Sequence, residues 1–110
     1  MRSGEVWWAD LPSPAGRRPV LLLSRDAAYR VRTSVTVAVI TRTIRGIPVE
    51  VALDEQDGMP TRCVVNLDNI LTIPKALLKN PLTVLSREKM AQVSRAIVFA
   101  LDLSRDLPAI

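Results

Sequence analysis

The sequence predicts a mainly β fold (α+β): a small, partly open barrel of the SH3 type that carries one C-terminal amphipathic helix. Three observations lead to this fold class. The chain has 110 residues, which suits one domain with one core. Most apolar stretches are short, rich in β-branched residues and bounded by turn residues, which is typical of strands. Only the stretch before the C-terminus has helical spacing. We expect a single domain over residues 1–110 whose tail, at about 104–110, is frayed.

Strands are predicted from the N-terminus onward. Alternation in GEVWWADL indicates a first strand at 5–10, and the continuous apolar run at 20–24 indicates a buried one. The β-branched segment SVTVAVI makes 34–40 the clearest strand of the chain. Residues 49–53 form the next strand, and residues 63–73 form one or two more.

The segments between these strands read as turns and loops. LPSPAGRRP, at 11–19, is a turn-rich loop because its prolines and its glycine do not continue a ladder. Residues 25–33 form a loop or a single helical turn, and 41–48 form a basic loop. DEQDGMP, at 54–60, is a turn, and a short helical turn lies within 75–81.

One helix is expected at about 87–101. Ser86 is suited to cap it, and Glu88 in the first turn suits the positive end of the helix dipole. One apolar face follows from spacings of three and four residues and consists of Met90, Val93, Ile97 and Leu101. This face packs on the sheet.

Composition removes several classes of protein. Hydrophobic residues make up 48% and charged residues 24%, as in ordinary globular domains. Cys63 is the single cysteine and there is no histidine, so an internal disulfide, a cysteine–histidine zinc cluster and a catalytic triad with histidine are all excluded. The chain contains no P-loop, dinucleotide fingerprint or nucleophile elbow. We expect no cofactor.

The N-terminus and the overall hydrophobicity indicate a cytoplasmic protein. MRSGEVWWADL carries charges and no long apolar run, unlike a signal peptide. No apolar stretch approaches the ~20 residues of a membrane span, so no membrane partner is expected. Three carboxylates crowd one turn, at Asp54, Glu55 and Asp57. We interpret them as a solvated charge run, with weak Mg²⁺ binding as the less favoured alternative, and expect no metal site.

Charge is segregated along the chain. The net charge is +4, but residues 17–45 and 75–95 are strongly basic whereas 50–69 is acidic. Arginine predominates among the basic residues, and its planar guanidinium fits phosphates and base edges. A polyanion is therefore a natural partner, with nucleic acid first. A solvated basic face that keeps the protein soluble explains the charge equally well.

Two basic segments concentrate the candidate binding groups. AGRRP precedes one buried strand and ITRTIRG follows another, so the two lie on one rim if those strands are neighbours. Together they carry Arg17, Arg18, Thr41, Arg42, Thr43 and Arg45. Arginine donors and threonine hydroxyls could then surround a phosphate. Composition alone favours ordinary exposed loop arginines.

Two adjacent tryptophans have a separate meaning. Trp7 and Trp8 point to opposite faces of the first strand. Either one belongs to the core while the other covers an edge, or one lies in an interface between copies of the chain. We favour a dimer.

Five segments, in order, resemble the MazF/PemK family of toxin endoribonucleases. GEVWWADL is similar to its opening strand, and GRRPVLLLSRD to its Arg-Pro strand. VAVITRTIRGIPVEV is similar to its strand that ends in Thr before a basic loop. CVVNLDNILTIPKALL resembles its acidic-amide segment and LSREKMAQVSRAIVFALDL its last helix. The resemblance covers nearly the whole chain.

The resemblance implies a MazF/CcdB-like barrel that forms a homodimer and cleaves single-stranded RNA without a metal. The catalytic residues it implies are Arg18 and Thr41. Its acidic and amide pair corresponds to Asp68 and Asn69, with Asn where the family more often has Gln. The loop before Arg18 is short for the family, so no cleavage sequence is implied.

An activity follows as a hypothesis. The RNA 2′-OH attacks the neighbouring phosphate while Arg18 and Thr41 stabilise the developing charge. Flanking phosphates or bases would contact Arg17, Arg42, Thr43, Arg45, Asp68 and Asn69. The expected substrate is messenger RNA, with transfer or ribosomal RNA as further candidates. The family also implies an antitoxin whose acidic, disordered segment covers the toxin. The alternatives are a nucleic-acid-binding barrel without activity and a CcdB-like toxin that binds gyrase.

Overall fold

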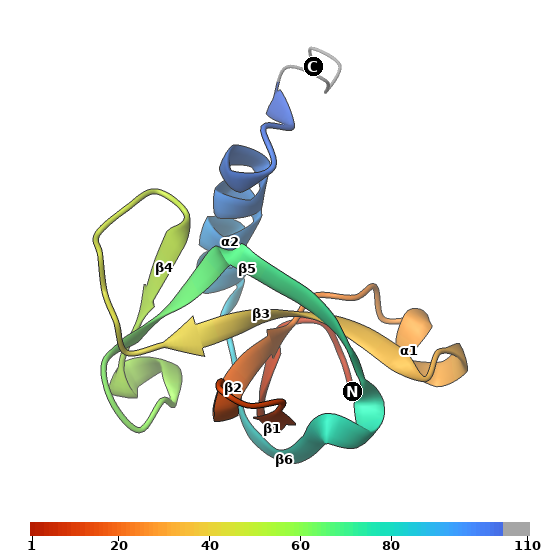
Figure 1. Cartoon of the computed structure of the whole chain (residues 1–110). Coiled ribbons are helices and arrows are strands. Elements are labelled where there is room, and N and C mark those ends of the chain that lie inside the picture. The colour runs from red at the N-terminus through yellow and green to blue at the C-terminus, as the bar shows by residue number, and fades with distance from the viewer. Residues whose placement is uncertain (105–110) are drawn as a thin grey trace.

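A computed structural model describes residues 1–104 as one strongly curled sheet with a helix packed against its outer side (Figure 1). The frayed tail predicted at about 104–110 lies outside the described residues, apart from Ser104. The strands are β1 (Glu5–Leu11), β2 (Gly16–Leu22), β3 (Ser34–Thr41), β4 (Glu50–Leu53), β5 (Cys63–Pro74) and β6 (Leu78–Val84). The helical segments are α1 (Ala28–Val31), η1 (Glu55–Asp57), η2 (Lys75–Leu77) and α2 (Arg87–Ala100).

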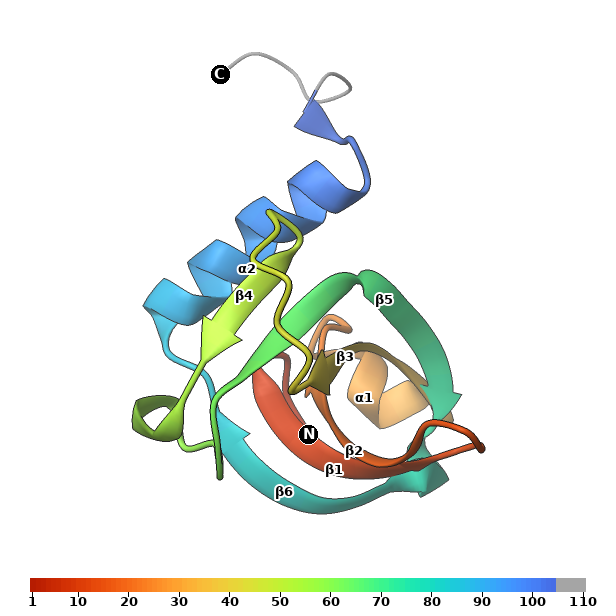
Figure 2. The ribbon, with the colours of Figure 1, turned by 60° about the vertical axis from the view of Figure 1, so that its left-hand side comes forward.

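The six strands form a half-barrel in the order β4-β5-β3-β2-β1-β6, and every neighbouring pair is antiparallel. The curl is clear in Figure 2, where β5 and β6 bend round the same space. The end strands β4 and β6 do not pair with each other. The prediction of a mainly β, partly open barrel with a C-terminal helix is therefore confirmed.

The sheet separates two apolar cores. In β2, Leu21 points into the first core, and Val20 and Leu22 point into the second. This explains why the strand is a continuous apolar run, since both of its faces are buried. The first core includes Val93 and Ala96 of α2, and the second is covered at one end by Tyr29 of α1.

Most predicted elements are confirmed. The strands expected at 5–10, 34–40 and 49–53 differ from β1, β3 and β4 by a residue at one end. The segment 63–73 is a single bent strand, β5. Its pairing with β3 jumps from Asn66 opposite Val39 to Ile70 opposite Ala38, which leaves three residues of β5 without partners on β3.

Two strand predictions were wrong. Strand β2 begins at Gly16 rather than Val20, because Gly16–Pro19 pair with β1 alone, a position that tolerates proline. Strand β6 was missed, since LKNPLTV is polar and contains Pro81. It is an edge strand on β1 with two register shifts, which is where proline is accepted.

The helices follow the sequence with one exception. The predicted single helical turn is α1, and the predicted C-terminal helix is α2, capped by Ser86 Oγ, which accepts a hydrogen bond from Lys89 N (3.1 Å). Leu101 was expected on the buried face but is 55% exposed. It follows the last residue of α2, Ala100, at the end of the helix. Among residues 1–104, no helix is long and apolar enough to span a membrane.

Candidate functional site

A cleft of about 480 Å³ opens where β2 and β3 stop pairing. Their ladder runs from Leu22 opposite Val37 to Val20 opposite Val39 and goes no further. The next residue of β2 is Pro19, which has no N–H to donate. The cleft is lined by Trp8, Ala15, Arg17, Arg18, Pro19, Ile40, Thr41, Arg42, Met59, Pro60, Thr61 and Cys63.

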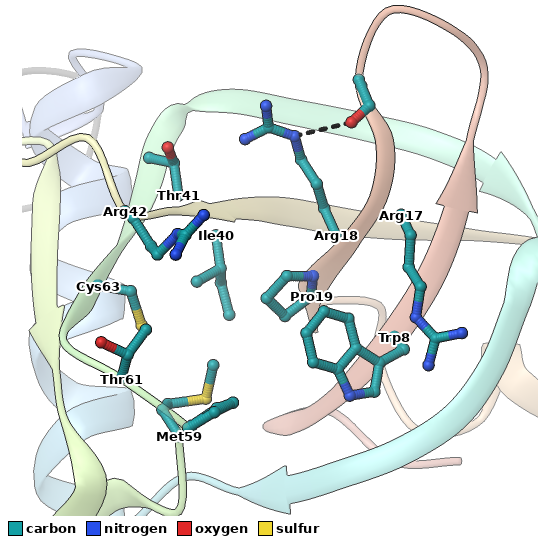
Figure 3. Close-up of a pocket in the computed structure, with 12 residues that line it drawn as sticks. Trp8, Arg17, Arg18, Pro19, Ile40, Thr41, Arg42, Met59, Thr61 and Cys63 are labelled. Atoms are coloured by element: carbon teal, nitrogen blue, oxygen red, sulfur yellow. Dashed lines mark hydrogen bonds between the residues drawn. The ribbon is translucent and has the colours of Figure 1, made fainter.

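Arg18 and Thr41 come together at this point, as the sequence predicted for two basic segments on one rim. Continuing the β2–β3 register by two residues sets Arg18 opposite Thr41. Arg18 lies two residues from Val20, and Thr41 lies two residues from Val39. Both valines belong to the second core, so the Arg18 and Thr41 side chains emerge on the same face of the sheet. Figure 3 shows both at the same end of the cleft.

The Arg18 side chain is held by the hairpin that precedes it. Its Nε donates a hydrogen bond to the carbonyl oxygen of Ala15 (3.0 Å). This contact occupies the inner nitrogen and leaves both terminal NH₂ groups available. A guanidinium held in this way can offer two parallel donors to one phosphate.

Thr41 is oriented by the chain that follows it. Its Oγ1 accepts a hydrogen bond from the backbone N–H of Thr43 (3.1 Å). Since a hydroxyl has one proton to donate and accepts separately, the Thr41 proton stays available for a ligand. Arg18 and Thr41 together supply cationic and neutral donors and no acceptor charge, which suits an anion.

Two more predicted residues line the cleft. Arg17 lies over the Trp8 ring, with its guanidinium carbon 5.1 Å from the ring centroid. Arg42 follows Thr41 directly and is exposed. Figure 3 shows Arg17 beside Trp8 at one wall and Arg42 at the opposite wall. The cleft therefore has a cation on each side, and none of the residues that line it in the described part of the chain is acidic.

Thr43 and Arg45 do not line the cleft. They lie in the exposed loop at 42–48, which folds round the carboxylate of Glu50. That carboxylate accepts hydrogen bonds from the backbone N–H groups of Arg45 (3.1 Å) and Gly46 (2.8 Å). The loop backbone is thus fixed, while both side chains face solvent.

Asp68 and Asn69 also lie away from the cleft. Both are exposed and belong to the part of β5 that has no partner on β3. Just before them, Leu67 N donates to the carbonyl oxygen of Val49 at the end of the basic loop (2.9 Å). Their predicted contact with RNA stays a prediction, and it would occur beside the loop rather than in the cleft.

One wall of the cleft was missed by the sequence analysis. It consists of Met59, Pro60, Thr61 and Cys63, which follow η1. Met59, Pro60 and Thr61 lie in the connection from β4 to β5, and Cys63 begins β5. The start of β5 pairs with the end of β3, where Val64 lies opposite Thr41, so this segment stands beside the cleft. Met59 and Cys63 are buried and supply apolar surface, whereas Thr61 is exposed.

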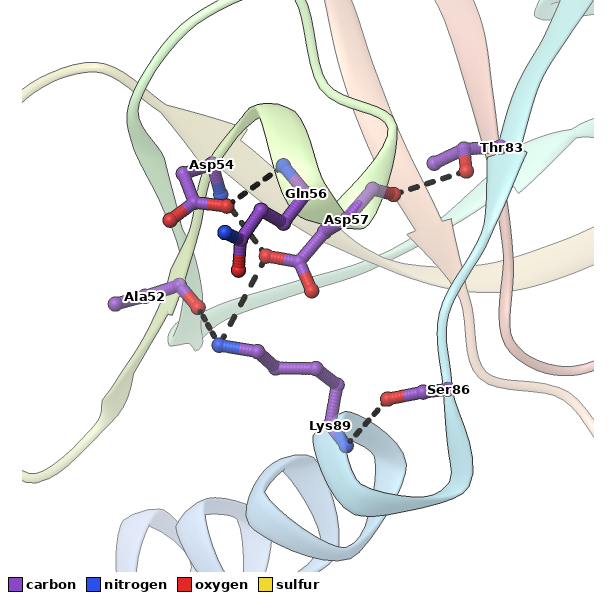
Figure 4. A network of polar contacts seen from close by, with 7 residues as sticks. All are labelled: Ala52, Asp54, Gln56, Asp57, Thr83, Ser86 and Lys89. Atoms are coloured by element: carbon purple, nitrogen blue, oxygen red, sulfur yellow. Dashed lines mark hydrogen bonds and ion pairs between the residues drawn. The ribbon is translucent and has the colours of Figure 1, made fainter.

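A polar network fixes this wall to the rest of the fold (Figure 4). Asp54 caps η1, and Asp57 accepts a reciprocal hydrogen bond from Asp54 N (2.9 Å). Lys89 of α2 donates to the carbonyl oxygen of Ala52 (2.6 Å) and lies 3.8 Å from the Asp57 carboxylate. Thr83 of β6 donates to the carbonyl oxygen of Asp57 (2.9 Å). The acidic turn thus has a structural role.

Cys63 contributes apolar surface rather than nucleophilic chemistry. Burial raises the pKa of the thiol, and the neighbouring Asp57 and Asp54 raise it further. The thiolate is the reactive form of cysteine, so this environment suppresses reactivity near neutral pH. The chemistry of the cleft therefore rests on its arginine and threonine side chains.

The geometry agrees with three comparisons. The profile of the PemK-like, MazF-like toxins of type II toxin–antitoxin systems matches residues 2–101. The chain is 43% identical to the probable endoribonuclease MazF5 of Mycobacterium tuberculosis, over 93% of this chain and 94% of the relative. The M. tuberculosis toxin MazF-mt6 superposes with a TM-score of 0.83 at 36% identity, over 89% of this chain and 96% of that one. An endoribonuclease from a mycobacterial species, solved with its cognate antitoxin, superposes with a TM-score of 0.86 at 32% identity, over 98% and 99%. The chain therefore belongs to the PemK-like, MazF-like family of type II toxins.

Proposed function

We propose that this protein is the toxin of a toxin–antitoxin pair and an endoribonuclease that cleaves single-stranded RNA at specific sequences in the cytoplasm. The observation that carries the proposal is the meeting of Arg18 and Thr41 on one face of the sheet at the cleft. The relatives named above, two of which carry the name endoribonuclease, support it. Messenger RNA is the first candidate substrate.

The reaction that fits this site is attack by the 2′-OH of the RNA on its own neighbouring phosphate. The 2′-oxygen forms a bond to phosphorus, and the bond from phosphorus to the 5′-oxygen breaks. The products are a 2′,3′-cyclic phosphate and a 5′-OH. Because the substrate carries the nucleophile, this route needs neither an enzyme nucleophile nor a metal, and it spares DNA.

Arg18 and Thr41 stabilise the charge that builds on the phosphate. The terminal NH₂ groups of Arg18 hold the non-bridging oxygens, and the Thr41 hydroxyl donates to the same phosphoryl group. Donors that are already positioned act most strongly on the charge of the transition state. Removing one such donor typically raises the barrier by about 2.7–4 kcal/mol.

Protons move through water in this scheme. Arginine, with a pKa above roughly 12, does not readily accept the proton of the 2′-OH. None of the residues that line the cleft is acidic. The proton of the 2′-OH therefore passes to water, and the 5′-oxygen receives one from water as it leaves.

The remaining predicted residues bind the RNA on either side of the scissile phosphate. Arg17 and Arg42 stand at opposite walls of the cleft and contact the adjoining nucleotides. Outside the cleft, the RNA continues along the basic loop. There it meets Thr43, Arg45, Asp68 and Asn69.

We also propose two protein partners. The first is a cognate antitoxin with an acidic, disordered segment, which suits the arginines of the cleft, since none of them forms an ion pair within residues 1–104. The second is another copy of this chain. β6 is an edge strand, and its last residue, Val84, is 66% exposed, so apolar surface is available on that edge.

A gyrase-binding toxin is the second candidate, and one observation favours it. Such a toxin would need apolar anchors at the end of its last helix, and Phe99 and Leu101 are 61% and 55% exposed there. The arginine and threonine pair at the cleft has no role in that function. We therefore place RNA cleavage first.

The deciding experiment is cleavage of a long mixed-sequence RNA in EDTA, with analysis of the product ends. Wild type, Arg18→Ala and Thr41→Ala are compared after circular dichroism has shown that all three fold. Cuts at discrete sites with 5′-OH ends, lost in both variants, support the proposal. RNA that is bound and stays intact makes the protein a binder, and inhibited supercoiling by gyrase without RNA cleavage makes it a gyrase toxin.

A further inference from the structure

The cleft has an apolar half that the phosphate chemistry does not use. Ile40 belongs to the first core, and Trp8 and Pro19 lie two residues from Val6 and Leu21 of that core, so they share its face of the sheet. Arg18 and Thr41 share the opposite face with the second core. The cleft therefore wraps round the strand ends, with its phosphate donors on one face of the sheet and apolar surface on the other. Met59 and Cys63 complete that surface.

Trp8 is the one aromatic side chain of this cleft. The chain has four aromatic residues. Tyr29 is buried in the second core, Trp7 packs against the same core, and Phe99 lies on α2. Trp8 is only partly buried, so part of its ring is open to solvent. Its position at the cleft leaves aromatic surface where a ligand would lie.

The ring is paired with a cation that has no ion pair. The Arg17 guanidinium carbon lies 5.1 Å from the Trp8 centroid. Asp10 is the residue opposite Arg17 in the β1–β2 register, yet among residues 1–104 no acidic side chain forms an ion pair with Arg17. Indole and guanidinium planes are the two surfaces on which proteins stack unpaired bases.

Polar groups stand across the cleft from this pair. Figure 3 shows Thr61 and Arg42 on the wall that faces Trp8 and Arg17. Thr61 is exposed, and its hydroxyl can donate to or accept from the edge of a base. An apolar platform with a few facing polar groups is the arrangement that holds and orients a flat ligand.

We propose that this half of the cleft is a nucleobase subsite. One base next to the scissile phosphate stacks on the part of the Trp8 ring that Arg17 leaves uncovered, and Thr61 contacts its edge. The subsite rests on the proposed function, because its ligand is a base of the RNA whose phosphate lies at Arg18 and Thr41. With a single stacking side chain, the subsite accepts one base and not a run of bases.

The test combines abasic RNA with a Trp8 variant. After the cleavage site of wild type is mapped, short RNAs are made with a 2′-deoxy nucleotide at the scissile position, so that they bind without being cut. Each RNA of the series has one abasic position.

For wild type, we expect one abasic position beside the scissile phosphate to weaken binding by about 5- to 150-fold, the range for one stacked base. Trp8→Ala should bind intact RNA as weakly as wild type binds that abasic RNA. In this variant, removing the base should cause no further loss of affinity.

Trp8→Phe is the matched variant, since it keeps an aromatic ring and should keep most of the base dependence. A fluorescence measurement uses Trp7→Phe, in which Trp8 is the only tryptophan. Intact uncleavable RNA should quench its emission, and the abasic RNA should quench it less. The emission of Trp8→Phe, which reports Trp7, should not change.

The outcomes separate the two proposals. If wild type does not cut RNA at all, the proposed function fails and the subsite fails with it. If wild type cuts RNA but Trp8→Ala keeps the same abasic profile, only the subsite is wrong. Equal quenching of Trp8 by intact and abasic RNA would also overturn it, since the ring would then sense the backbone and not a base.

Discussion

The Nε of Arg18 donates a 3.0 Å hydrogen bond to the carbonyl oxygen of Ala15, which ties the side chain to the hairpin before β2. A lysine keeps the charge but has neither this inner donor nor a planar pair of outer ones. We expect Arg18→Lys to lower kcat for RNA cleavage by about 100- to 1,000-fold, the cost of one lost preorganised donor. Single-turnover cleavage in EDTA measures this.

Arg30→Lys is the matched control for Arg18→Lys. Arg30 is exposed on α1 and does not line the cleft, so this variant should cut RNA like wild type. Equal activity of Arg18→Lys and Arg30→Lys would show that Arg18 acts only as a charge. The bidentate role would then be wrong.

The Thr41 hydroxyl gives a second prediction. Thr41→Val keeps the shape of the side chain and removes the hydroxyl, whereas Thr41→Ser keeps the hydroxyl. We expect Val to lower kcat by about 100-fold or more, and Ser to stay within a few-fold of wild type. Both should unfold in urea near the wild-type midpoint, because Thr41 accepts only one hydrogen bond, at a partly exposed position. Two variants with the same activity would remove the hydroxyl from the mechanism.

Much of the fold could be predicted because most strands carry a local signal. Six of the eight residues of β3 are β-branched, and the run in β2 is apolar because both its faces are buried. β6 carries no such signal. Its Pro81 is tolerated only because β6 lies at the sheet edge with shifted register, and edge position is a property of the assembled sheet.

The site was predictable in part for the same reason. Arg18 comes just before the apolar run of β2 and Thr41 ends β3, and the two strands proved to be neighbours, so both residues reach one rim. Met59 and Thr61 could not be placed, because they reach the cleft through a connection whose path depends on the order of β4 and β5 in the sheet. The meeting of Arg18 and Thr41 therefore follows from the ends of two neighbouring strands, whereas the facing wall depends on a longer connection.

That facing wall depends on Gly58. Its φ is +87°, and a Cβ added there would lie 2.3 Å from Thr83 Oγ1. Gly58→Ala should therefore add left-handed strain of about 1–2 kcal/mol to overpacking of about 1–3 kcal/mol, and it should disturb the hydrogen bond from Thr83 to Asp57. Urea unfolding measures the loss of stability.

Gly46 supplies the comparison for Gly58. Its φ is +71°, but an added Cβ meets no atom within 4 Å. Gly46→Ala should therefore cost only the backbone strain. The double variant Gly58→Ala/Thr83→Ala should recover only part of the steric loss, because alanine at 83 removes Oγ1 but keeps the Cβ that lies 2.8 Å from the added atom. If Gly58→Ala and Gly46→Ala are equally stable, Thr83 does not constrain the turn.

Tyr29 connects stability to pH. The residue is 5% exposed, and its hydroxyl makes no hydrogen bond of ordinary geometry among residues 1–104, although Ser24 lies close enough to interact with it weakly. Burial raises the pKa of Tyr29 to about 12, which outweighs the lowering by neighbouring Ser24, and Asp26 and Glu5 add to the rise. Since the unfolded tyrosine ionises near pH 10, its contribution to stability is complete below pH 10. That contribution is lost as the pH rises from 10 to 12.

Tyr29→Phe removes both the ionisation and the unsatisfied hydroxyl. At neutral pH we expect the variant to be at least as stable as wild type, because only a weak interaction with Ser24 is lost with the hydroxyl. Between pH 10 and 12, wild type should lose stability relative to the variant, so the gap between their urea midpoints should widen in favour of phenylalanine. The comparison cancels the titration of lysines, which both proteins share. A constant gap across this pH range would mean that the Tyr29 hydroxyl is as well solvated in the folded protein as in the unfolded chain.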